Sequence, residues 1–223
     1  MNTRVSSIIF TKSKFSIAKV SVLNILHKPR REFITSVLWL FLSIKGKINF
    51  LQLSRYGENG EQYYRRHFAK RFDFAGFNAE LIRSCASRHL VLALDPTHLP
   101  KSGNKTYGKD FFWSGCAGEI KLGLEFNGIA AIDIDNHTAL HLEAQQTPTH
   151  SYLKQNGLTQ FDWYLSLVGQ VIKKHRGLSR YLCADAYFSR EPFVEGLAKL
   201  NINLISRLRD DAVMFYPFLG EPS

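Results

Sequence analysis

The stretch His89-Leu90-Val91-Leu92-Ala93-Leu94-Asp95-Pro96 decides the fold class of this chain. Its continuous apolar run is typical of a central β-strand that is buried on both faces. Proline cannot donate to a strand ladder, so the strand is predicted to end at Asp95-Pro96, with Asp95 at its carboxyl end. The pattern recurs at Tyr181-Leu182-Cys183-Ala184-Asp185, where a short apolar strand leads into a second aspartate.

The residues around these two strands predict a mixed sheet. Residues 111–114, 122–134 and 138–145 are rich in β-forming side chains and are interrupted by glycines, as expected for an antiparallel meander that follows the first strand. Residues 161–172 carry apolar side chains at helical spacing. A helix at 190–200 and a strand at 202–206 then complete a βαβ pattern, which implies parallel neighbours. The fold class is therefore α/β, a mixed sheet with flanking helices.

Composition excludes several other classes of protein. A chain of 223 residues with 45% hydrophobic content can bury one substantial core and a small second unit. The three cysteines are odd in number and lack CxxC spacing, which argues against a disulfide framework or a structural zinc site and favours the reducing cytoplasm. The apolar run 33–44 covers 12 residues, whereas a bilayer needs about 20. It predicts a buried helix, and no membrane is expected as a partner.

The positive charge of the chain is concentrated at its N-terminal end. Residues 1–72 hold 14 Lys or Arg against 3 acids, a net of +11, and residues 73–223 hold 15 against 16, a net of −1. A basic segment joined to a near-neutral domain suits a nucleic-acid-binding protein, because each phosphate contact releases counterions. The alternative is a solvated surface that only aids solubility.

The basic half is predicted to contain a leader, residues 1–32, and a helical DNA-binding segment, residues 33–87. Short helices at 33–44, 48–55 and from 61 onward, separated by glycine-containing turns, are compatible with a helix-turn-helix-like unit. A further helix is expected at 79–87. The aromatics and cations of 63–71 suit phosphate contact with stacking, or an ordinary amphipathic helix. The candidate DNA-binding side chains of this segment are Arg55, Arg65, Arg66, Lys70 and Arg71.

The candidate catalytic residues are Asp95 and Asp185, each of which directly follows an apolar strand. Neighbouring strand ends would bring the two carboxylates together, where they stay ionised only if a divalent cation bridges them. Hard oxygen ligands favour Mg²⁺ or Mn²⁺, and such a site serves two-metal phosphodiester chemistry. The alternative is that both aspartates end strands because of their turn propensity.

Two stretches of the remaining region, residues 88–223, resemble the DDE transposases of bacterial insertion sequences. One runs from Leu94-Asp95-Pro96-Thr97-His98-Leu99-Pro100-Lys101 to Tyr107-Gly108 and continues through Phe112-Trp113-Ser114-Gly115 to Ala131-Ile132-Asp133. The other is Ala184-Asp185-Ala186-Tyr187-Phe188, followed by Ile205-Ser206-Arg207-Leu208-Arg209. The resemblance covers about residues 90–215 and implies an RNase H-like fold.

By this resemblance Asp95 is the first acid and Asp185 the second acid of a DDE triad. The third acid, a Glu on a helix beyond the last strand, has no candidate. Glu191 and Glu195 come too early in the order of elements, and Glu221 lies in a Gly-Pro segment. The catalytic core, residues 88–223, is therefore predicted to be incomplete at its C-terminal end, through truncation of the gene or because the chain is a fragment.

The resemblance also implies the reaction and the partners. The expected activity is metal-dependent cleavage of transposon ends followed by strand transfer to target DNA, by a homo-oligomer associated with the nucleoid in the cytoplasm. Lys101, Lys105 and Lys109 would face the DNA phosphates, or else are solvated loop lysines. Two alternatives stay open: a catalytically inactive, truncated DNA-binding protein or inhibitor of transposition, and a different RNase H-like nuclease or resolvase that acts on branched nucleic acid.

Two other motifs suggest different chemistry. Residues 103–109 match a phosphate-binding loop until Asp110 stands where Ser or Thr would bind magnesium, and the following residues predict a strand rather than a helix. This interpretation is rejected. His98, His137 and His141 are possible metal ligands, but scattered histidines more often have structural hydrogen bonds.

Overall fold

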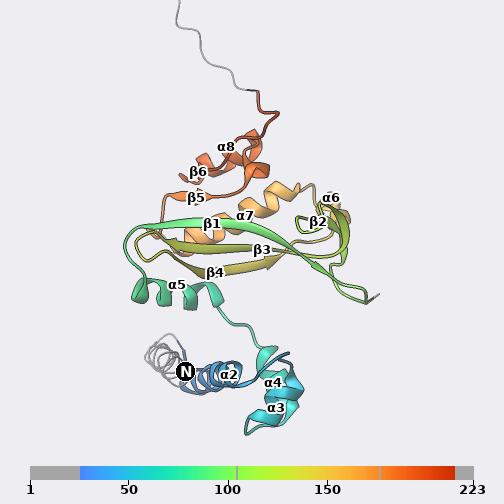
Figure 1. The fold of residues 1–223 in the computed structure, drawn as a ribbon, viewed down its shortest axis with the longest axis vertical. Helices are drawn as coiled ribbons and strands as arrows, with labels where there is room; N and C mark the ends of the chain where they lie inside the picture. The colour runs from blue at the N-terminus through green and yellow to red at the C-terminus, as the bar shows by residue number, and fades with distance from the viewer. Residues whose placement is uncertain (1–25, 104, 176, 214–223) are drawn as a thin grey trace, which may run out of the picture. The chain divides into compact units, whose positions relative to one another are not determined.

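The computed structural model describes residues 26–103, 105–175 and 177–213, and the chain divides into two compact units, residues 1–73 and 74–223. Most of the predicted basic leader lies outside the described residues, as does Glu221. Figure 1 shows the helices of the first unit and the sheet of the second.

The described part of the first unit consists of three helices, α2 (Lys28–Ser43), α3 (Phe50–Tyr56) and α4 (Glu61–Phe68). Phe33, Val37 and Leu40 recur on one face of α2, and they form a small core with Leu53 of α3 and Tyr64 of α4. The predicted buried helix at 33–44 is thus α2. No helix in the described part of the chain is long and apolar enough to cross a membrane.

The second unit is built on a six-stranded mixed sheet whose strands follow the order β2-β3-β1-β5-β6, with β4 also paired to β3. The bounds are β1 (Leu90–Pro100), β2 (Asp110–Ser114), β3 (Glu119–Asp133), β4 (Thr138–Gln146), β5 (Tyr181–Cys183) and β6 (Asn203–Ile205). β1 to β4 pair antiparallel, whereas β5 lies parallel to both β1 and β6. The predicted fold class, an RNase H-like mixed sheet with flanking helices, is confirmed.

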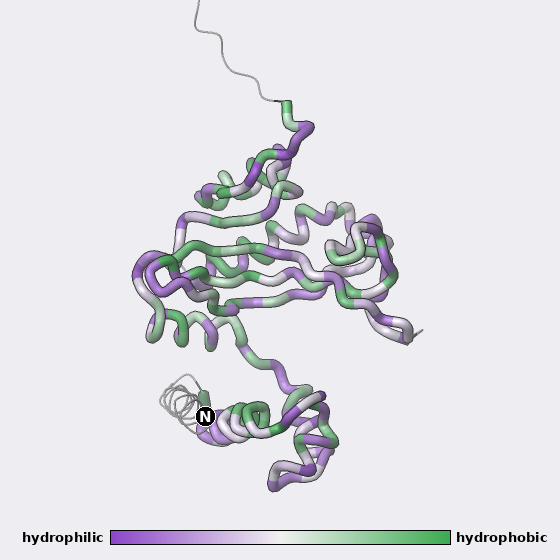
Figure 2. Tube along the Cα trace, viewed as in Figure 1, coloured by the Kyte–Doolittle hydropathy of each residue, from purple (hydrophilic) through white to green (hydrophobic). Residues whose placement is uncertain are grey.

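Burial alternates along the long strands β1 and β3, and Figure 2 shows that both apolar (green) and polar (purple) residues occur along the strands of the sheet. The inward positions of β3 and β1 carry Ile129, Ala131 and Leu92, all fully buried. Alternation of this kind places one side chain in the core for each one turned away from it. The sheet thereby obtains an apolar centre around β1, which the opening motif of the sequence predicted.

β1 continues beyond Asp95-Pro96, where the sequence predicted that it would end. It stays paired with β3 as far as Pro100 opposite Gly123. β5 pairs with β1 only at Leu92 and Ala93, so on that side β1 is an unpaired edge from Asp95 onward. Proline is tolerated at such an edge because no ladder bond is lost. The prediction that β1 ends there was wrong, and the end of its partner β5 is what marks the position of Asp95.

The order of the antiparallel strands also differs from a simple meander, because β3 rather than β2 lies next to β1. The hairpin of β2 and β3 turns at Gly118, whose φ of +64° lies in the left-handed region. Glycine adopts this conformation without steric cost. β3 is long enough to pair with three strands, β1, β2 and β4.

Helices flank the sheet: α5 (Phe74–Cys85) packs beside β4, and buried side chains of both α5 and α7 (Gln160–Lys174) join the core of the sheet (Figure 1). α7 begins with a capping box between Thr159 and Asp162, which satisfies two of the backbone donors that a helix start leaves unpaired. α6 (His150–Gln155) and α8 (Glu191–Lys199) are shorter, and a 3₁₀ turn, η1 (Ala186–Phe188), follows β5.

The boundary between the two units differs from the predicted division at residue 87. Ala79 and Ile82 of α5 are buried in the core of the sheet, and the side-chain amide of Asn78 donates to the Leu142 carbonyl of β4 at 3.1 Å. Residues 74–87 therefore belong with the sheet rather than with the basic helices.

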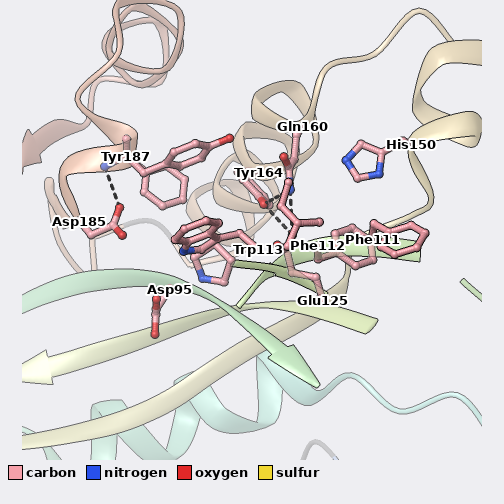
Figure 3. A pocket seen from close by; sticks show the side chains of 13 residues that line it. Asp95, Phe111, Phe112, Trp113, Glu125, His150, Gln160, Tyr164, Asp185 and Tyr187 are labelled. Carbon is pink, nitrogen blue, oxygen red and sulfur yellow. Dashed lines mark hydrogen bonds between the residues drawn. The ribbon is translucent and has the colours of Figure 1, made fainter. Parts of the chain in front are cut away.

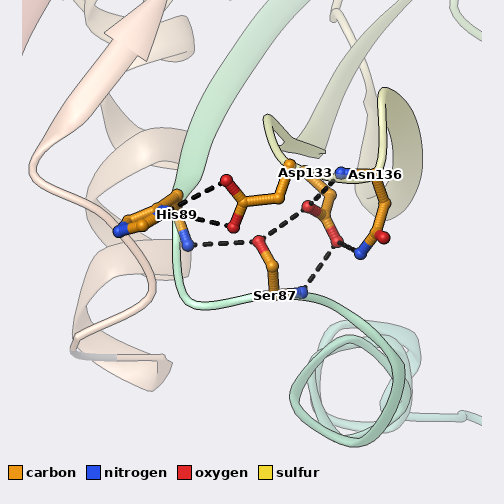
Figure 4. Close-up of polar contacts among 5 residues, drawn as sticks. Ser87, His89, Asp133 and Asn136 are labelled. Atoms are coloured by element: carbon orange, nitrogen blue, oxygen red, sulfur yellow. Dashed lines mark hydrogen bonds and ion pairs between the residues drawn. The ribbon is translucent and has the colours of Figure 1, made fainter.

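A hydrogen-bonded carboxylate closes the end of the sheet where β1 begins (Figure 4). Asp133 accepts from the backbone N–H and the hydroxyl of Ser87, both at 2.7 Å, and from the side-chain amide and backbone N–H of Asn136 at 2.8 and 3.1 Å. These bonds to the charged form hold the pKa of Asp133 far below its usual range, although burial opposes them. Asp133 thus joins the start of β1 to the β3–β4 turn.

Candidate active site

The sheet brings Asp95 and Asp185 to the same level of two neighbouring parallel strands. Leu92 pairs with Leu182 and Ala93 with Cys183, and each aspartate follows its strand residue by two positions. Strands in a sheet lie about 4.8 Å apart, so the two residues lie at neighbouring strand ends. Both line one pocket of about 380 Å³.

Local structure fixes the backbone of Asp185. Its side chain accepts the Tyr187 N–H at 3.0 Å and caps η1, and its carbonyl accepts the Ser206 hydroxyl at 2.8 Å. The chain therefore turns sharply out of β5 at this residue, in the way that aspartate favours. Turn propensity and a place in the pocket are both real properties of Asp185, so the two interpretations of the sequence are not exclusive.

Asp95 is exposed at the edge of β1, and no hydrogen bond to its side chain occurs among the described residues. Burial, followed by the negative charge of Asp185, raises the pKa of Asp95. A cation between the two groups would relieve the repulsion and lower that pKa again. The two oxygen ligands thus fit a hard divalent ion such as Mg²⁺ or Mn²⁺. Among the described residues no cluster of three or more His, Cys, Asp or Glu side chains is suited to hold a metal ion.

A third carboxylate in the pocket, Glu125 of β3, was missed by the sequence analysis. It is only 4% exposed, and its Oε1 accepts from the Tyr164 hydroxyl at 2.6 Å and from the Gln160 side-chain amide at 3.1 Å. Burial and the neighbouring Glu125 charge raise the pKa of Tyr164 strongly, so this phenol remains a donor. The sequence could have indicated Glu125 only by its inward position in an alternating strand. That position becomes informative once helix α7 is known to cover this face of the sheet.

Aromatic side chains form much of the remaining wall of the pocket. Trp113 and Phe111 of β2 are 60% and 58% exposed, and Tyr187 beside Asp185 is 40% exposed. Figure 3 shows Asp95 and Asp185 on one side of the pocket and Phe111 and His150 on the other. Large apolar surfaces that stay exposed inside a pocket mark a ligand site, and the flat faces of nucleobases suit them.

The other predicted site residues of the second unit lie outside this pocket. Lys101, Lys105 and Lys109 lie on the loop between β1 and β2, and Lys109 donates to the Gly103 carbonyl at 2.8 Å. Glu191 and Glu195 of α8 line a separate surface hollow. The third acid is thus not supplied by α8.

The three histidines are also dispersed in the structure. His98 lies on β1, His137 occupies the β3–β4 turn with a positive φ of 50°, and His141 lies on β4. Among the described residues they belong to no cluster that could hold a metal ion, and the buried Nε2 of His98 has no hydrogen-bond partner there.

In the first unit the aromatics of α4 serve packing. Tyr64 is 1% exposed, and Tyr63 and His67 pack on the Phe33 ring of α2. Burial, followed by the charges of Lys70, Arg30 and Arg66, lowers the pKa of His67. The unit thus has a locally positive surface around α4, but its aromatic rings are used by the core.

The candidate cations of this unit are not equivalent. Arg65 pairs with Glu61 and lies over the Phe50 ring, 4.7 Å from its centroid. Arg55, Arg66, Lys70 and Arg71 are exposed, and no ion pair to them occurs among the described residues. These four have side chains available for phosphates.

An RNase H-like sheet with acids on two neighbouring strands is the architecture of a class of enzymes that cleave phosphodiester bonds with metal ions. The family model described as DDE superfamily endonuclease matches residues 24–222, and the chain belongs to this family. No curated protein matches the chain. Family membership implies DNA as the substrate and nuclease chemistry as the activity.

Proposed function

We propose that the chain is a DNA transposase, or part of one, that cleaves transposon ends and transfers the freed strand to target DNA. The observation that supports this most directly is the placement of Asp95 and Asp185 at one level of adjacent strands, within one pocket. Their mutual repulsion would favour the binding of a divalent cation in the pocket, and family membership implies that the substrate is DNA.

Asp95 and Asp185 would hold Mg²⁺ or Mn²⁺, which when bound supplies charge neutralisation at the scissile phosphate and an acidified water. The chain's own groups position the substrate. Trp113 and Phe111 offer flat apolar surfaces to bases, and the Arg190 guanidinium lies over the Tyr187 ring, 5.3 Å from its centroid. The pocket thus combines a place for the phosphate with a place for its base.

The first unit would supply sequence-independent affinity through Arg55, Arg66, Lys70 and Arg71. Phosphate contacts of this kind set register on the duplex without reading bases. Lys101, Lys105 and Lys109 extend the same role to the loop after β1. We propose further that the chain acts on the bacterial nucleoid as a homo-oligomer, which would let two DNA ends be processed together.

The test is nicking of DNA that carries the transposon ends, with Mg²⁺ or Mn²⁺ and with EDTA as the blank. Cleavage that needs the metal and is lost in Asp95→Asn and in Asp185→Asn supports the proposal. Asp135→Asn is the matched control, because Asp135 is an exposed aspartate paired with His89, away from the pocket. DNA binding without nicking in the wild-type chain would favour the alternative, a DNA-binding module or inhibitor.

A further inference from the structure

A block of polar side chains lies on the ladder of β3 and β4, on the face that α7 covers. Asn127 pairs with Gln145, and the Thr147 N–H donates to the Glu125 carbonyl at 2.9 Å, which places these two opposite each other. Side chains two apart on a strand share a face. Glu125, Asn127, Gln145 and Thr147, the polar block, therefore occupy the four corners of one patch of the sheet.

Three members of the polar block are buried and Gln145 is half-buried, and most of the block's side-chain oxygens lack protein partners. Asn127 and Thr147 are both 0% exposed. Both side-chain polar atoms of Asn127, the Oε1 of Gln145 and the Oγ1 of Thr147 make no hydrogen bond in the described part of the chain. Native proteins pair nearly all such atoms, so several on one patch indicate a bound species that they share.

The donor set indicates the kind of species. We propose that the polar block binds a monovalent alkali cation, Na⁺ or K⁺. A carboxylate, two amide oxygens and a hydroxyl are hard ligands of the kind that alkali and alkaline-earth ions take. Glu125 is the single charge among them, so one positive charge makes the buried site neutral, which a low-dielectric interior favours.

The hydrogen bonds that Glu125 accepts support its role as a ligand of the cation. Its Oε1 already accepts from Tyr164 and Gln160 at the start of α7, whereas no hydrogen bond to its Oε2 occurs among the described residues. Across a ladder, opposite side chains have Cβ atoms roughly 5 Å apart, so side chains from the four corners can converge on one ion. The bound cation would fix the position of Glu125 in the wall of the pocket that Asp95 and Asp185 also line.

This cation site is separate from the proposed divalent site, and its test does not depend on catalysis. The melting temperature of the full chain is measured in KCl, NaCl and choline chloride at equal ionic strength, with EDTA present. The expected result is a midpoint roughly 2–4 °C higher in KCl or NaCl than in choline chloride. Equal midpoints in all three chlorides would overturn the proposal.

Two variants test whether the polar block causes the difference in melting temperature between the alkali chlorides and choline chloride. Glu125→Gln keeps the shape of the side chain and removes its charge, and Thr147→Val keeps the volume and removes one ligand. Both should lose the difference between potassium and choline, whereas Thr138→Val, at an exposed position of β4, should keep it. The double variant Asp95→Asn/Asp185→Asn should also keep it, even if all cleavage is lost. A difference that survives in both block variants contradicts the assignment.

Direct observation is available if the block variants do not fold. Crystals of the wild-type chain soaked in thallium(I) should show one anomalous peak among the four side chains, because Tl⁺ replaces K⁺. Ordered water molecules that bridge the same four side chains, without an anomalous peak, would overturn the proposal.

Discussion

Two aspartates at different levels of the β1–β3 ladder have opposite surroundings. Asp133 lies opposite Leu90 and receives hydrogen bonds from Ser87 and Asn136, so its pKa is lowered. Asp95 lies opposite Gly128, no hydrogen bond to its side chain occurs among the described residues, and burial together with Asp185 raises its pKa. The protein itself satisfies the first carboxylate, while the second is exposed and is left to solvent or to a bound ion. Surroundings, rather than residue type, separate a structural acid from a candidate catalytic one.

The largest expected effect is the loss of DNA cleavage when Asp95 is replaced. Asp95→Asn should lower the rate of metal-dependent nicking by at least roughly 1,000-fold, because several kcal/mol of charge stabilisation at the phosphate would be lost. Asp133→Asn, measured at a temperature where it is folded, should cleave at a rate close to that of the wild type. Single-turnover nicking rates with Mg²⁺ check both predictions. Equal losses of nicking rate in the two variants would contradict the distinction between Asp95 as a candidate catalytic acid and Asp133 as a structural one.

The stabilities of the Asp95→Asn and Asp133→Asn variants should differ in the opposite direction from their cleavage rates. The folded-state pKa of Asp95 is raised, so in metal-free buffer its contribution to stability falls as the pH rises through the range between the unfolded and the folded pKa. Asp95→Asn removes this penalty. At pH 7 in EDTA the variant should therefore melt at the same temperature as the wild type or slightly above it. A clear drop in its melting temperature would show that Asp95 has a structural role.

The next effect concerns the ligand side of the pocket. Trp113→Ala should weaken binding of DNA that has an unpaired base at the cleavage position by roughly tenfold, because stacking on an aromatic ring contributes about 1–3 kcal/mol per base. Trp113→Phe should retain most of the affinity. Tyr181→Ala is the control, since Tyr181 is 49% exposed at the far end of β5. Fluorescence anisotropy measures the DNA affinity of all three variants. Equal losses of affinity in Trp113→Ala and Tyr181→Ala would refute a specific role for Trp113 in the aromatic wall of the pocket.

A smaller effect is the pH dependence of Asp133. Because its folded pKa lies below the ordinary value of 3.8, the stabilisation is fully present above that value and is lost as the pH falls through the folded pKa. Asp133→Asn should therefore unfold at a lower denaturant concentration than the wild type at pH 7, and the gap should narrow below about pH 4. A gap that does not change between pH 7 and pH 3 would mean that the charge is not what stabilises the turn.

The sequence predicted those features that depend on local pattern. The apolar run before Asp95, the helical spacing of α7 and the βαβ order of β5, α8 and β6 each follow from periodicity within one segment. The meeting of Asp95 and Asp185 followed from the rule that parallel strands end at one edge. That rule placed the pair at the correct level, although β1 itself continues to Pro100 because β3 pairs with it there.

Features that depend on contacts between distant segments were missed. The helix α5 was assigned to the basic segment because its pattern does not reveal which core it will join. Glu125 meets Tyr164 and Gln160 across 39 and 35 positions, and Thr147 faces Glu125 only through the register of β3 with β4. An alternating strand shows which side chains share a face, but not that an aromatic helix will bury that face.

The comparison of a satisfied charge with an unsatisfied one extends to the cations of α4. Arg65 pairs with Glu61 and packs on Phe50, whereas the adjacent Arg66 is exposed and no ion pair to it occurs among the described residues. If Arg66 contacts a phosphate, Arg66→Ala should reduce the slope of log affinity against log salt concentration by about 0.9. Arg65→Ala should change that slope less and should lower the melting temperature of the helical unit instead. Titrations of duplex DNA at several salt concentrations measure the slope, and identical slopes for wild type and Arg66→Ala would remove this side chain from the DNA-binding surface.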